Sequence, residues 1–397
     1  MIKLDDALRL IDEAVRPLPA KETPLLEALG CCLAQDVVSP IDVPQFASSA
    51  MDGIAVAFAD AQKASALKVQ GIIPAEQPAK ERLRPGYAYR IMTGAPLPEG
   101  ADTVVPVEEL EFAGDIVKIK GAFEPGQHIR LAGNDVKAGQ IVLTAKTRLG
   151  AIEIGICAGL GMTQVAVHSK PKIALAATGS EIAKPGERLQ PGQIYNSNNA
   201  TLRGLLKAGG WGKVAELPDL KDDFDTLLPA LEKLSREHDV IITSGAVSAG
   251  EFDYIPKVVQ KLGGVLLFHK VAIKPGKPAL IAKLGRCWLL SLPGNPVSVV
   301  VTYHLYAARV LCRQTGNRTS PPREKAVLAE AVKVDSDRFY VLGAYLERTP
   351  SSLMAREAKR YQSGRLSSII GINGFMFLGE GEYMLPEGTE VEVEFLQ

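Results

Sequence analysis

The feature that most constrains the fold is a regular alternation of apolar runs and amphipathic segments between residues 170 and 315. KIALAAT (172–178), DVIITSG (239–245) and WLLSL (288–292) are almost continuously apolar, and helical patterns such as DFDTLLPALEKLSRE (223–237) separate them. Strands that are apolar along their whole length are buried on both faces, as in parallel sheets covered by crossover helices. The pattern therefore predicts an α/β domain built on a parallel sheet.

The regions on either side of this alternation have different sequence patterns, which predict other kinds of secondary structure. Residues 1–35 are predicted to be helical, from apolar positions at helical spacing at the start of the chain. Short β-rich runs separated by Gly and Pro fill residues 54–147 and predict a compact β domain, and residues 148–168 are predicted to form a helical bridge. Residues 320–397 are again strand-rich, which predicts a small β barrel or sandwich. A chain of 397 residues is long enough for two to four such domains.

Charge and cysteine content exclude several classes of protein. The 45 Lys and Arg residues balance the 45 Asp and Glu residues, which argues against a nucleic-acid-binding protein with a large basic surface. No stretch approaches the roughly 20 apolar residues of a membrane span, and the N-terminus lacks a signal-peptide pattern. The five scattered cysteines are typical of a reducing, cytoplasmic compartment, and the histidines do not cluster with them as a zinc site would require.

The unusual residues of the α/β region all follow strands. ATGSE (177–181), TSGAVSAGEFDY (243–254), IKPGKP (273–278) and SLPGNP (291–296) each come directly after an apolar run. Ligands of open α/β sheets bind beyond the carboxyl ends of the strands, so the four loops are expected to converge on one crevice. For any single loop, a simple turn-forming role of Gly, Pro and Ser is equally plausible. For all four loops together, a binding site is the better interpretation.

The residue types in these loops indicate a phosphorylated ligand that is carried with Mg²⁺. Lys274 and Lys277 supply positive charge on a loop stiffened by prolines, and Glu181, Asp222 and Asp253 offer the hard oxygen ligands that Mg²⁺ prefers. No G-x-G-x-x-G or P-loop motif is present. The alternative for Asp222 is an N-cap role, because it precedes a predicted helix. The segments 44–56 and 91–106 also contain polar loops, which hairpin chemistry would explain equally well.

Six motifs, taken in order, resemble the MoeA family, the molybdopterin molybdenumtransferases to which the gephyrin E domain is related. The motifs are PQFASSAMDGIAV, IMTGAPLPEGADTVVP, ATGSEI, SGAVSAGEFDY, AIKPGKP and LPGNPVS. The resemblance implies an elongated domain formed by 1–53 and 130–168, a β domain at 54–129, a molybdopterin-binding α/β domain at 169–316 and a C-terminal β barrel at 320–397. It also implies a homodimer whose active site lies between the α/β domain of one subunit and the β domain of the other.

The reaction that the resemblance implies uses adenylylated molybdopterin, molybdate and Mg²⁺, and it releases AMP together with the molybdenum cofactor. Matching the family's motifs residue by residue assigns catalytic roles to Asp52, Thr93, Glu181, Asp222 and Asp253, of which the last three would also hold the metal. The substrate-binding residues on the same basis are Asp135, Ser244, Gly245, Lys270, Lys274, Lys277, Pro293, Pro296, Arg338, Ser363 and Ser368. Ser180 and Asn134 depart from the family pattern, since an acidic residue is usual at both positions.

Two other functions are weighed against this transferase. An adenylyltransferase of the preceding step uses a similar α/β domain, but the motifs around Asp52 and Thr93 argue against it. A non-catalytic scaffold is the second alternative, and the retained lysines and carboxylates argue against it. The expected partners are a second copy of the chain, the molybdopterin adenylyltransferase, and downstream molybdoenzymes or cofactor-transfer proteins. The sequence does not distinguish molybdate from tungstate.

Overall fold

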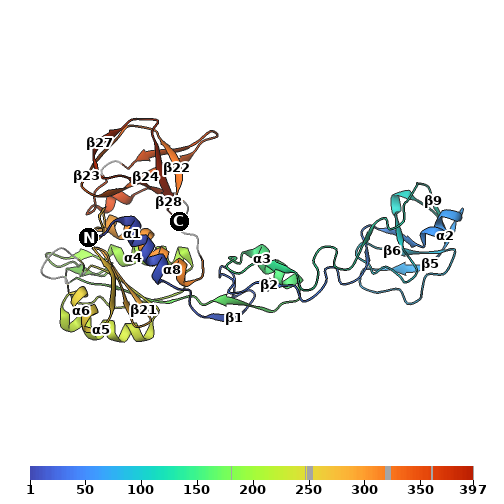
Figure 1. Ribbon diagram of the computed structural model, residues 1–397, viewed down its shortest axis with the longest axis horizontal. Helices are drawn as coiled ribbons and strands as arrows, with labels where there is room; N and C mark the ends of the chain where they lie inside the picture. The colour runs from blue at the N-terminus through green and yellow to red at the C-terminus, as the bar shows by residue number, and fades with distance from the viewer. Residues whose placement is uncertain (180, 246, 248–253, 318–322, 359–360, 397) are drawn as a thin grey trace.

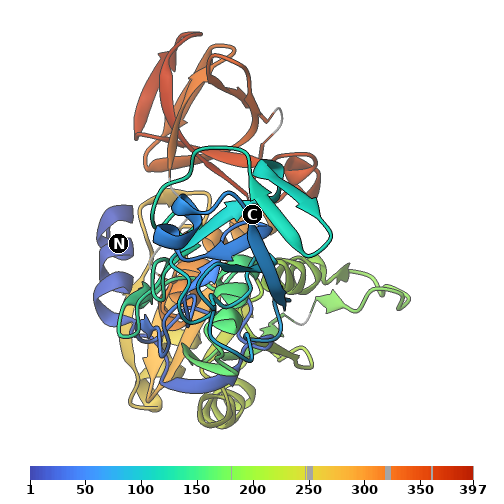
Figure 2. The same ribbon diagram turned by 90° about the vertical axis from the view of Figure 1, so that its right-hand side faces the viewer.

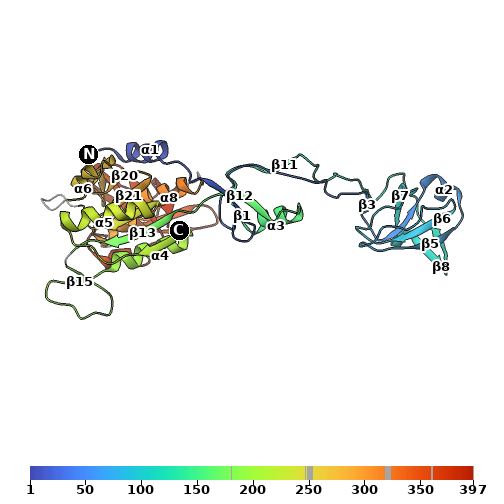
Figure 3. The ribbon, with the colours of Figure 1, turned by 90° about the horizontal axis from the view of Figure 1, so that it is seen from below.

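The computed structural model describes residues 1–396 except 180, 246, 248–253, 318–322 and 359–360. The molecule is elongated (Figure 1), with the α/β body and the C-terminal barrel at one end and a β domain at the other. A narrow middle segment joins the two ends, and Figure 3 shows the same extended arrangement from below. Within the described part of the chain, no helix is both long enough and apolar enough to cross a membrane.

The α/β body is built on a six-stranded sheet in the order β16-β13-β17-β21-β20-β18. Its strands are β13 (Lys172–Ala177), β16 (Lys213–Glu216), β17 (Val240–Ser244), β18 (Val265–His269), β20 (Leu280–Leu284) and β21 (Cys287–Leu292). The predicted parallel arrangement holds for β16, β13, β17 and β21, whereas β20 runs antiparallel to both of its neighbours. The tight turn between β20 and β21 requires this reversal, because it is too short for a crossover.

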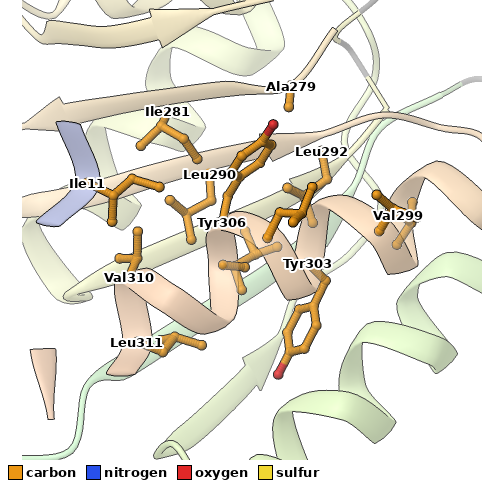
Figure 4. Packing of buried hydrophobic residues seen from close by; sticks show 14 of the residues in the cluster. Ile11, Ala279, Ile281, Leu290, Leu292, Val299, Tyr303, Tyr306, Val310 and Leu311 are labelled. Carbon is orange, nitrogen blue, oxygen red and sulfur yellow. The ribbon is translucent and has the colours of Figure 1, made fainter. Parts of the chain in front are cut away.

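Helices cover both faces of this sheet, as the apolar strands require. They are α4 (Ser197–Gly209), α5 (Phe224–Glu237), α6 (Ile255–Lys261) and a continuous helical stretch formed by α7 (Pro296–Thr302), the π-helical turn Tyr303–Ala307 and α8 (Ala308–Gln314). Tyr306 and Val310 of this stretch point toward Ile281 and Leu290 of the strands (Figure 4), and all four side chains are buried. This packing fixes the sheet from which the candidate site loops emerge.

The N-terminal segment differs from the prediction of a helix over residues 1–35. Helix α1 spans only Leu4–Ala14, and Ala20–Pro24 forms strand β1, which pairs with β12 (Gln164–His168). Pro17, Pro19 and Pro24 explain the difference, because proline lacks the helical N–H donor and disfavours helical geometry in the residue before it. The sequence prediction groups residues 1–53 with the elongated domain, but the apolar side chains of α1 pack into the core of the α/β body.

The middle segment consists of paired two-stranded ribbons and one helix. The ribbons are β1–β12, β2 (Val37–Val38) with β11 (Ile141–Leu143), and β3 (Ser48–Ser49) with β10 (Ile129–Arg130), and the helix is α3 (Ala151–Gly159). Its small core includes residues from both passes of the chain, such as Leu33 and Val167. The chain passes through this segment twice, once toward the β domain and once back to the α/β body. Two passes of the chain therefore connect the two ends of the molecule.

The β domain has a six-stranded sheet in the order β7-β4-β6-β5-β9-β8. The strands are β4 (Gly53–Val56), β5 (Leu67–Ile73), β6 (Tyr87–Ile91), β7 (Thr103–Pro106), β8 (Leu110–Ala113) and β9 (Ile116–Ile119), with a short helix α2 (Phe58–Lys63) and a 3₁₀ turn at Val107–Glu109. Its cores on the two faces of the sheet are formed by residues of this region and of the adjoining ribbon. The domain therefore has a core separate from that of the α/β body.

The C-terminal region is a closed five-stranded barrel, which selects the barrel from the two predicted alternatives. Strand β24 (Phe339–Arg348) pairs with both β25 (Leu353–Glu357) and β26 (Gly374–Leu378), and β22 (Glu324–Leu328) with β28 (Glu390–Phe395) completes the ring. A hairpin-like pair of β23 (Val332–Ser336) and β27 (Gly381–Leu385) and a 3₁₀ turn at Leu366–Ile369 extend it. Seen along the long axis (Figure 2), the barrel stands to one side of the α/β body.

Candidate functional site

The carboxyl ends of the strands in the α/β body are aligned at one edge of the sheet. In the register of the sheet, Ala177 lies beside Ser244, and Ser244 lies beside Leu292. Strands β18 and β21 run in the same direction, because both are antiparallel to β20, and β18 ends opposite Leu280 at the same edge. The loops that follow β13, β17, β18 and β21 therefore all leave the sheet at this edge, as the sequence predicts.

Two carboxylates lie together where the first of these loops meets the segment after β16. Thr178 pairs with Leu220 across this junction, which brings Glu181 close to Asp222. Burial raises the pKa of Asp222, and the negative charge of Glu181 raises it further. Within the described part of the chain, the buried Oδ1 atom of Asp222 has no hydrogen-bond partner. A half-buried carboxylate with a like-charged neighbour and an unsatisfied oxygen is suited to binding a cation.

The N-cap alternative for Asp222 is wrong, because the neighbouring residue has that role. Asp223 is the N-cap of α5, and its carboxylate accepts hydrogen bonds from Thr226 N (2.7 Å) and Thr226 Oγ1 (2.9 Å). These bonds lower the pKa of Asp223. The two adjacent aspartates therefore have different tasks, and Asp222 remains available at the site edge.

The segment 270–278, called the lysine loop because it contains Lys270, Lys274 and Lys277, is attached to the C-terminal barrel. Strand β19 (Ile273–Lys274) pairs in parallel with the start of β24, and Arg338 Nη1 donates to the carbonyl oxygen of Ile273 at 3.4 Å. Lys274 Nζ donates to the carbonyl oxygen of Asp335 at 2.9 Å and lies 5.4 Å from the centre of the Tyr340 ring. The barrel therefore lies beside the edge of the sheet from which the α/β loops emerge, and it places Arg338 next to strand β19, which contains Lys274.

The barrel also reaches the loop after β21. Asn295 Nδ2 donates to Ser363 Oγ at 3.5 Å, and Val297 N donates to the carbonyl oxygen of Ser363 at 3.3 Å. On the other side of the same loop, Asn198 Nδ2 donates to the carbonyl oxygen of Gly294 at 2.7 Å. Sequence reasoning missed Asn198 and Asn295, although both are polar residues at helix N-termini that face the predicted edge, a position that favours ligand contact.

Two glycines of the predicted motifs are required by close backbone approach. Gly245 has φ +91°, and a Cβ atom there would lie 2.4 Å from the carbonyl oxygen of Thr178. Gly276 has φ +111°, and its Cβ would lie 2.7 Å from a methyl group of Thr302. Both positions combine a left-handed backbone with contact that no side chain could occupy without displacement of the neighbour. Gly245 therefore holds the β17 loop against Thr178, and Gly276 holds the lysine loop against helix α7.

The remaining predicted residues at this end have mainly structural contacts. Ser244 is buried and its carbonyl oxygen accepts from Thr178 N, Pro293 is buried, and Pro296 is the first residue of α7. Ser368 is buried and its hydroxyl accepts from Gln362 N at 3.0 Å, so it orders the loop that presents Ser363.

The two other lysines of the loop differ in their main-chain contacts. The carbonyl oxygen of Lys270 accepts from Ile2 N, and that of Lys277 accepts from Val271 N. Lys270 has a left-handed backbone with φ +66°, and both side chains are half-buried. Asp253 lies outside the described residues.

A second cluster forms in the β domain from two predicted segments. Asp52 Oδ1 accepts hydrogen bonds from Thr93 N (2.6 Å) and Thr93 Oγ1 (2.9 Å), which lower the pKa of Asp52. Ser49 N donates to the carbonyl oxygen of Ala95, so the two loops are also joined through their backbones. Both Asp52 and Thr93 are exposed, and Asp52 is therefore held as a carboxylate that faces solvent at neutral pH.

The two clusters lie far apart within one chain. The β domain that contains Asp52 is at the opposite end of the molecule from the sheet edge that contains Lys274 (Figures 1 and 3). Asp135 is exposed in the connecting segment, where its N–H donates to the carbonyl oxygen of Val43. A single chain therefore has Glu181, Asp222 and the lysine loop at one edge of the sheet, whereas Asp52 and Thr93 lie at the other end of the molecule.

Comparison with known proteins assigns the chain to a family. The description "MoeA N-terminal region (domain I and II)" matches residues 2–161, "Probable molybdopterin binding domain" matches 174–312, and "MoeA C-terminal region (domain IV)" matches 325–396. A molybdopterin molybdenumtransferase of Haemophilus influenzae is 33% identical over 401 residues, which cover 99% of this chain and 98% of the relative. The chain belongs to the MoeA family. This confirms the resemblance inferred from the six motifs.

Other members of the MoeA family agree along the full length. A molybdopterin molybdenumtransferase 2 of Mycobacterium tuberculosis is 33% identical over 405 residues, covering 99% of each chain. The crystal structure of the molybdopterin biosynthesis MoeA protein from Pyrococcus horikoshii superposes with a TM-score of 0.87 at 32% identity, covering 100% of this chain and 99% of that one. The elongated arrangement of α/β body, barrel and β domain is therefore the architecture of the MoeA family.

Proposed function

We propose that this chain is a molybdopterin molybdenumtransferase that takes adenylylated molybdopterin and molybdate and releases AMP with the molybdenum cofactor. The observation that supports this most directly is that the lysine loop, the Glu181–Asp222 pair and the start of barrel strand β24 all lie at one edge of the sheet. Cations for an oxyanion and carboxylates for a metal–phosphate group are both needed by this reaction. The family to which the chain belongs agrees with it.

The carboxylate pair fits Mg²⁺ by its chemistry. Mg²⁺ is usually held by one or two carboxylates, with waters and substrate phosphates as its remaining ligands. Glu181 and Asp222 supply such a pair, and the unsatisfied Asp222 Oδ1 would gain a partner. Among the described residues no group of three or more His, Cys, Asp or Glu side chains is placed to hold a metal ion, and Asp253, the third predicted ligand, lies outside them. The bound ion would neutralise phosphate charge at the bond between the pterin phosphate and AMP.

The lysine loop is proposed to hold molybdate. Lysine ammonium groups act as point charges that accommodate a compact oxyanion without a demand for planar geometry. Lys274 is held by the Asp335 carbonyl and the Tyr340 ring, so its Nζ is positioned at the barrel wall before ligand arrives. Arg338 and Ser363 come from the barrel to the same edge and would complete the oxyanion contacts. Preorganised cations reduce the ordering cost of binding.

Asp52 and Thr93 are proposed to act from a second copy of the chain. The Thr93 hydrogen bonds keep Asp52 ionised, so it would orient a water or a substrate hydroxyl as an acceptor rather than donate a proton. Because this pair lies at the far end of its own chain, a homodimer with reciprocal sites would bring it to the partner's sheet edge. Each active site would then contain residues of both subunits.

Mixing two inactive variants tests the shared site. Asp52→Asn and Lys274→Ala chains, each inactive alone, are unfolded and refolded together so that subunits exchange. Random pairing yields half hybrid dimers with one intact site each, so about a quarter of wild-type activity is expected. If activity returns no further than the sum of the separate variants, the site is contained within one chain. A mixture of two Lys274→Ala preparations treated in the same way is the control.

A release assay tests the reaction itself. The protein is given adenylylated molybdopterin and Mg²⁺, and AMP is measured with and without molybdate. Molybdate-dependent AMP release is expected, with a loss of at least 100-fold in the Lys274→Ala/Lys277→Ala variant. Lys283→Ala, which removes an exposed lysine from strand β20, is the matched control and is expected to retain activity. If AMP never forms although the pterin nucleotide binds, the chain is a carrier rather than a transferase.

The proposed reaction also implies neighbours in the cell. An adenylyltransferase must supply the adenylylated substrate, and a molybdoenzyme or cofactor-transfer protein must accept the product. We place the reaction in the cytoplasm, because the five cysteines are scattered and odd in number, which is typical of proteins of reducing compartments.

A further inference from the structure

A basic cavity of about 600 Å³ lies at the amino-terminal edge of the sheet, opposite to the proposed transferase site. Four separate parts of the chain form it: strand β1 with the turn that follows it, the end of β12 with the linker to β13 and its first residue, the last turns of α4, and the start of β16. None of the residues assigned to the transferase site lines this cavity.

Cations dominate the lining, although the chain as a whole has no net charge. The charged lining residues are Lys21, Lys170, Lys172, Arg203, Lys207 and Lys213, against the single carboxylate of Glu27. Arg203 forms an ion pair with Glu216 at 2.7 Å. No ion pair within the described residues involves the five lysines, and all five are exposed. The charges of these five lysines are therefore not offset by ion pairs, and the carboxylates nearby include Glu27 in the lining and Asp239, which accepts a hydrogen bond from Lys172 N at 2.9 Å.

The lysines are placed in ways that are unfavourable for the isolated protein. Lys172 and Lys213 lie directly opposite each other on the neighbouring parallel strands β13 and β16, so their like charges repel each other. Arg203 and Lys207 lie four residues apart on α4, where like charges destabilise a helix. The position of Lys207 in the last turn of α4 is favourable for the helix dipole, but this does not account for the others. An anion bound between these elements would offset both repulsions.

The shape of the cavity indicates a small ligand. Sites for small molecules usually have volumes of roughly 300–1,000 Å³, whereas an acidic protein would be expected to dock on a broader, flatter surface. The half-buried Val214 supplies an apolar part of the wall between the cations. A ligand that matches both features has several negative charges and a compact apolar portion.

We propose that this cavity binds a compact organic polyphosphate, of the nucleoside di- or triphosphate class, at a site separate from the transferase centre. The phosphates lie between Lys172, Lys213 and Lys207, and the organic portion contacts Val214. Since the cavity joins the β1–β12 ribbon to α4 and the sheet, the ligand links the middle segment to the α/β body. The proposal does not depend on the identity of the transferase substrate.

Titration calorimetry with inorganic tripolyphosphate and with ATP tests the proposal. The experiments use the full chain in EDTA at low ionic strength, so that metal-dependent binding at the other edge is suppressed. Both ligands are expected to bind the wild type. Lys172→Ala/Lys213→Ala is expected to weaken binding at least tenfold, and Lys274→Ala/Lys277→Ala is expected to leave it unchanged. ATP is expected to bind more tightly than tripolyphosphate, because only ATP has an apolar portion.

Two further measurements separate loss of binding from loss of folding. Without ligand, the Lys172→Ala/Lys213→Ala variant is expected to melt at the same temperature as the wild type or higher, because a repulsion has been removed. Tripolyphosphate is expected to raise the melting temperature of the wild type but not of this variant. AMP release in the transferase assay is expected to persist in the variant, so failure of the transferase reaction and failure of this proposal give different results.

Three outcomes would overturn the proposal. Unchanged binding of tripolyphosphate to Lys172→Ala/Lys213→Ala would place the anion elsewhere, and loss only in Lys274→Ala/Lys277→Ala would place it at the transferase site. Binding of a glutamate decapeptide without binding of either phosphate ligand would identify the cavity as a docking site for an acidic polypeptide.

Discussion

Replacement of Glu394 by glutamine should stabilise the protein at neutral and alkaline pH. Glu394 lies on β28 of the barrel and lines a cavity of about 470 Å³ at the junction with the α/β body. Burial raises the pKa of its carboxyl from 4.5 to about 7, although Arg323 and Arg309 act in the opposite direction. Folding therefore imposes a cost on the ionised form of this side chain, and the neutral amide avoids that cost.

The expected gain follows from the two pKa values. Below pH 4.5 the carboxyl is protonated in both the folded and the unfolded chain, so the substitution has little effect on the free energy of unfolding. Above pH 7 it is ionised in both states and the full cost applies. The shift of about 2.5 units corresponds to a gain of about 3 kcal/mol at pH 8, about 2 kcal/mol at pH 6 and under about 0.5 kcal/mol at pH 4.5.

Urea unfolding followed by tryptophan fluorescence measures this gain. Trp211 lines the same cavity, so its emission reports on separation of the barrel from the body. Glu390→Gln is the matched control: it lies on the same strand in an exposed pair with Lys325, and a change within about 1 kcal/mol is expected. A gain for Glu394→Gln that does not depend on pH, or a loss of stability at pH 8, would refute the reasoning.

Three further predictions concern the candidate transferase site. Gly245→Ala should destabilise the protein by about 1–3 kcal/mol, because alanine disfavours the left-handed backbone and its Cβ would lie 2.4 Å from a carbonyl oxygen. Gly204→Ala in α4 is the control, since the space around its Cβ is open, and it should stabilise the protein by about 0.5–1 kcal/mol in chemical unfolding. Asp222→Asn should raise the melting temperature at pH 8, because the raised pKa of Asp222 shows that its ionised form is unfavourable in the folded protein. The same substitution should abolish any stabilisation by Mg²⁺. A Mg²⁺ response equal to that of the wild type would show that Asp222 is not a metal ligand. Thr93→Val should raise the pKa of Asp52 toward its ordinary value in an NMR titration, because one of two hydrogen bonds to the carboxylate is lost, and an unchanged pKa would show that the backbone bond alone is sufficient.

Much of the candidate site could be predicted because strand ends are encoded locally. Apolar runs define where β13, β17, β18 and β21 end, and strands that run in one direction bring the residues that follow them to one edge. The Gly and Pro residues of the loops mark close backbone approach, as Gly245 and Gly276 illustrate. The sequence pattern therefore predicts Lys274 and Glu181 at the same edge of the sheet without knowledge of the fold.

Contacts between segments that are far apart in the sequence could not be predicted from local sequence patterns. The choice between Asp222 and Asp223 as the helix cap depends on which carboxylate meets Thr226, and neighbouring aspartates look alike in sequence. Asn295 acquires its importance from Ser363, which is 68 residues away. The sequence predicts a parallel sheet, but β20 is antiparallel to β21 because a tight turn joins the two strands.

The sequence by itself determined the α/β alternation, the edge at which the loops end and the residue types available there, because periodicity and turn chemistry act over a few residues. Only the tertiary structure decided that α1 packs on the α/β body, that Asp52 and Thr93 meet each other at the far end of the chain, and that a neutral composition contains a concentrated basic cavity. These features depend on which surfaces of distant segments are buried together. Burial is a property of the whole folded chain, and a short stretch of residues does not specify its partner.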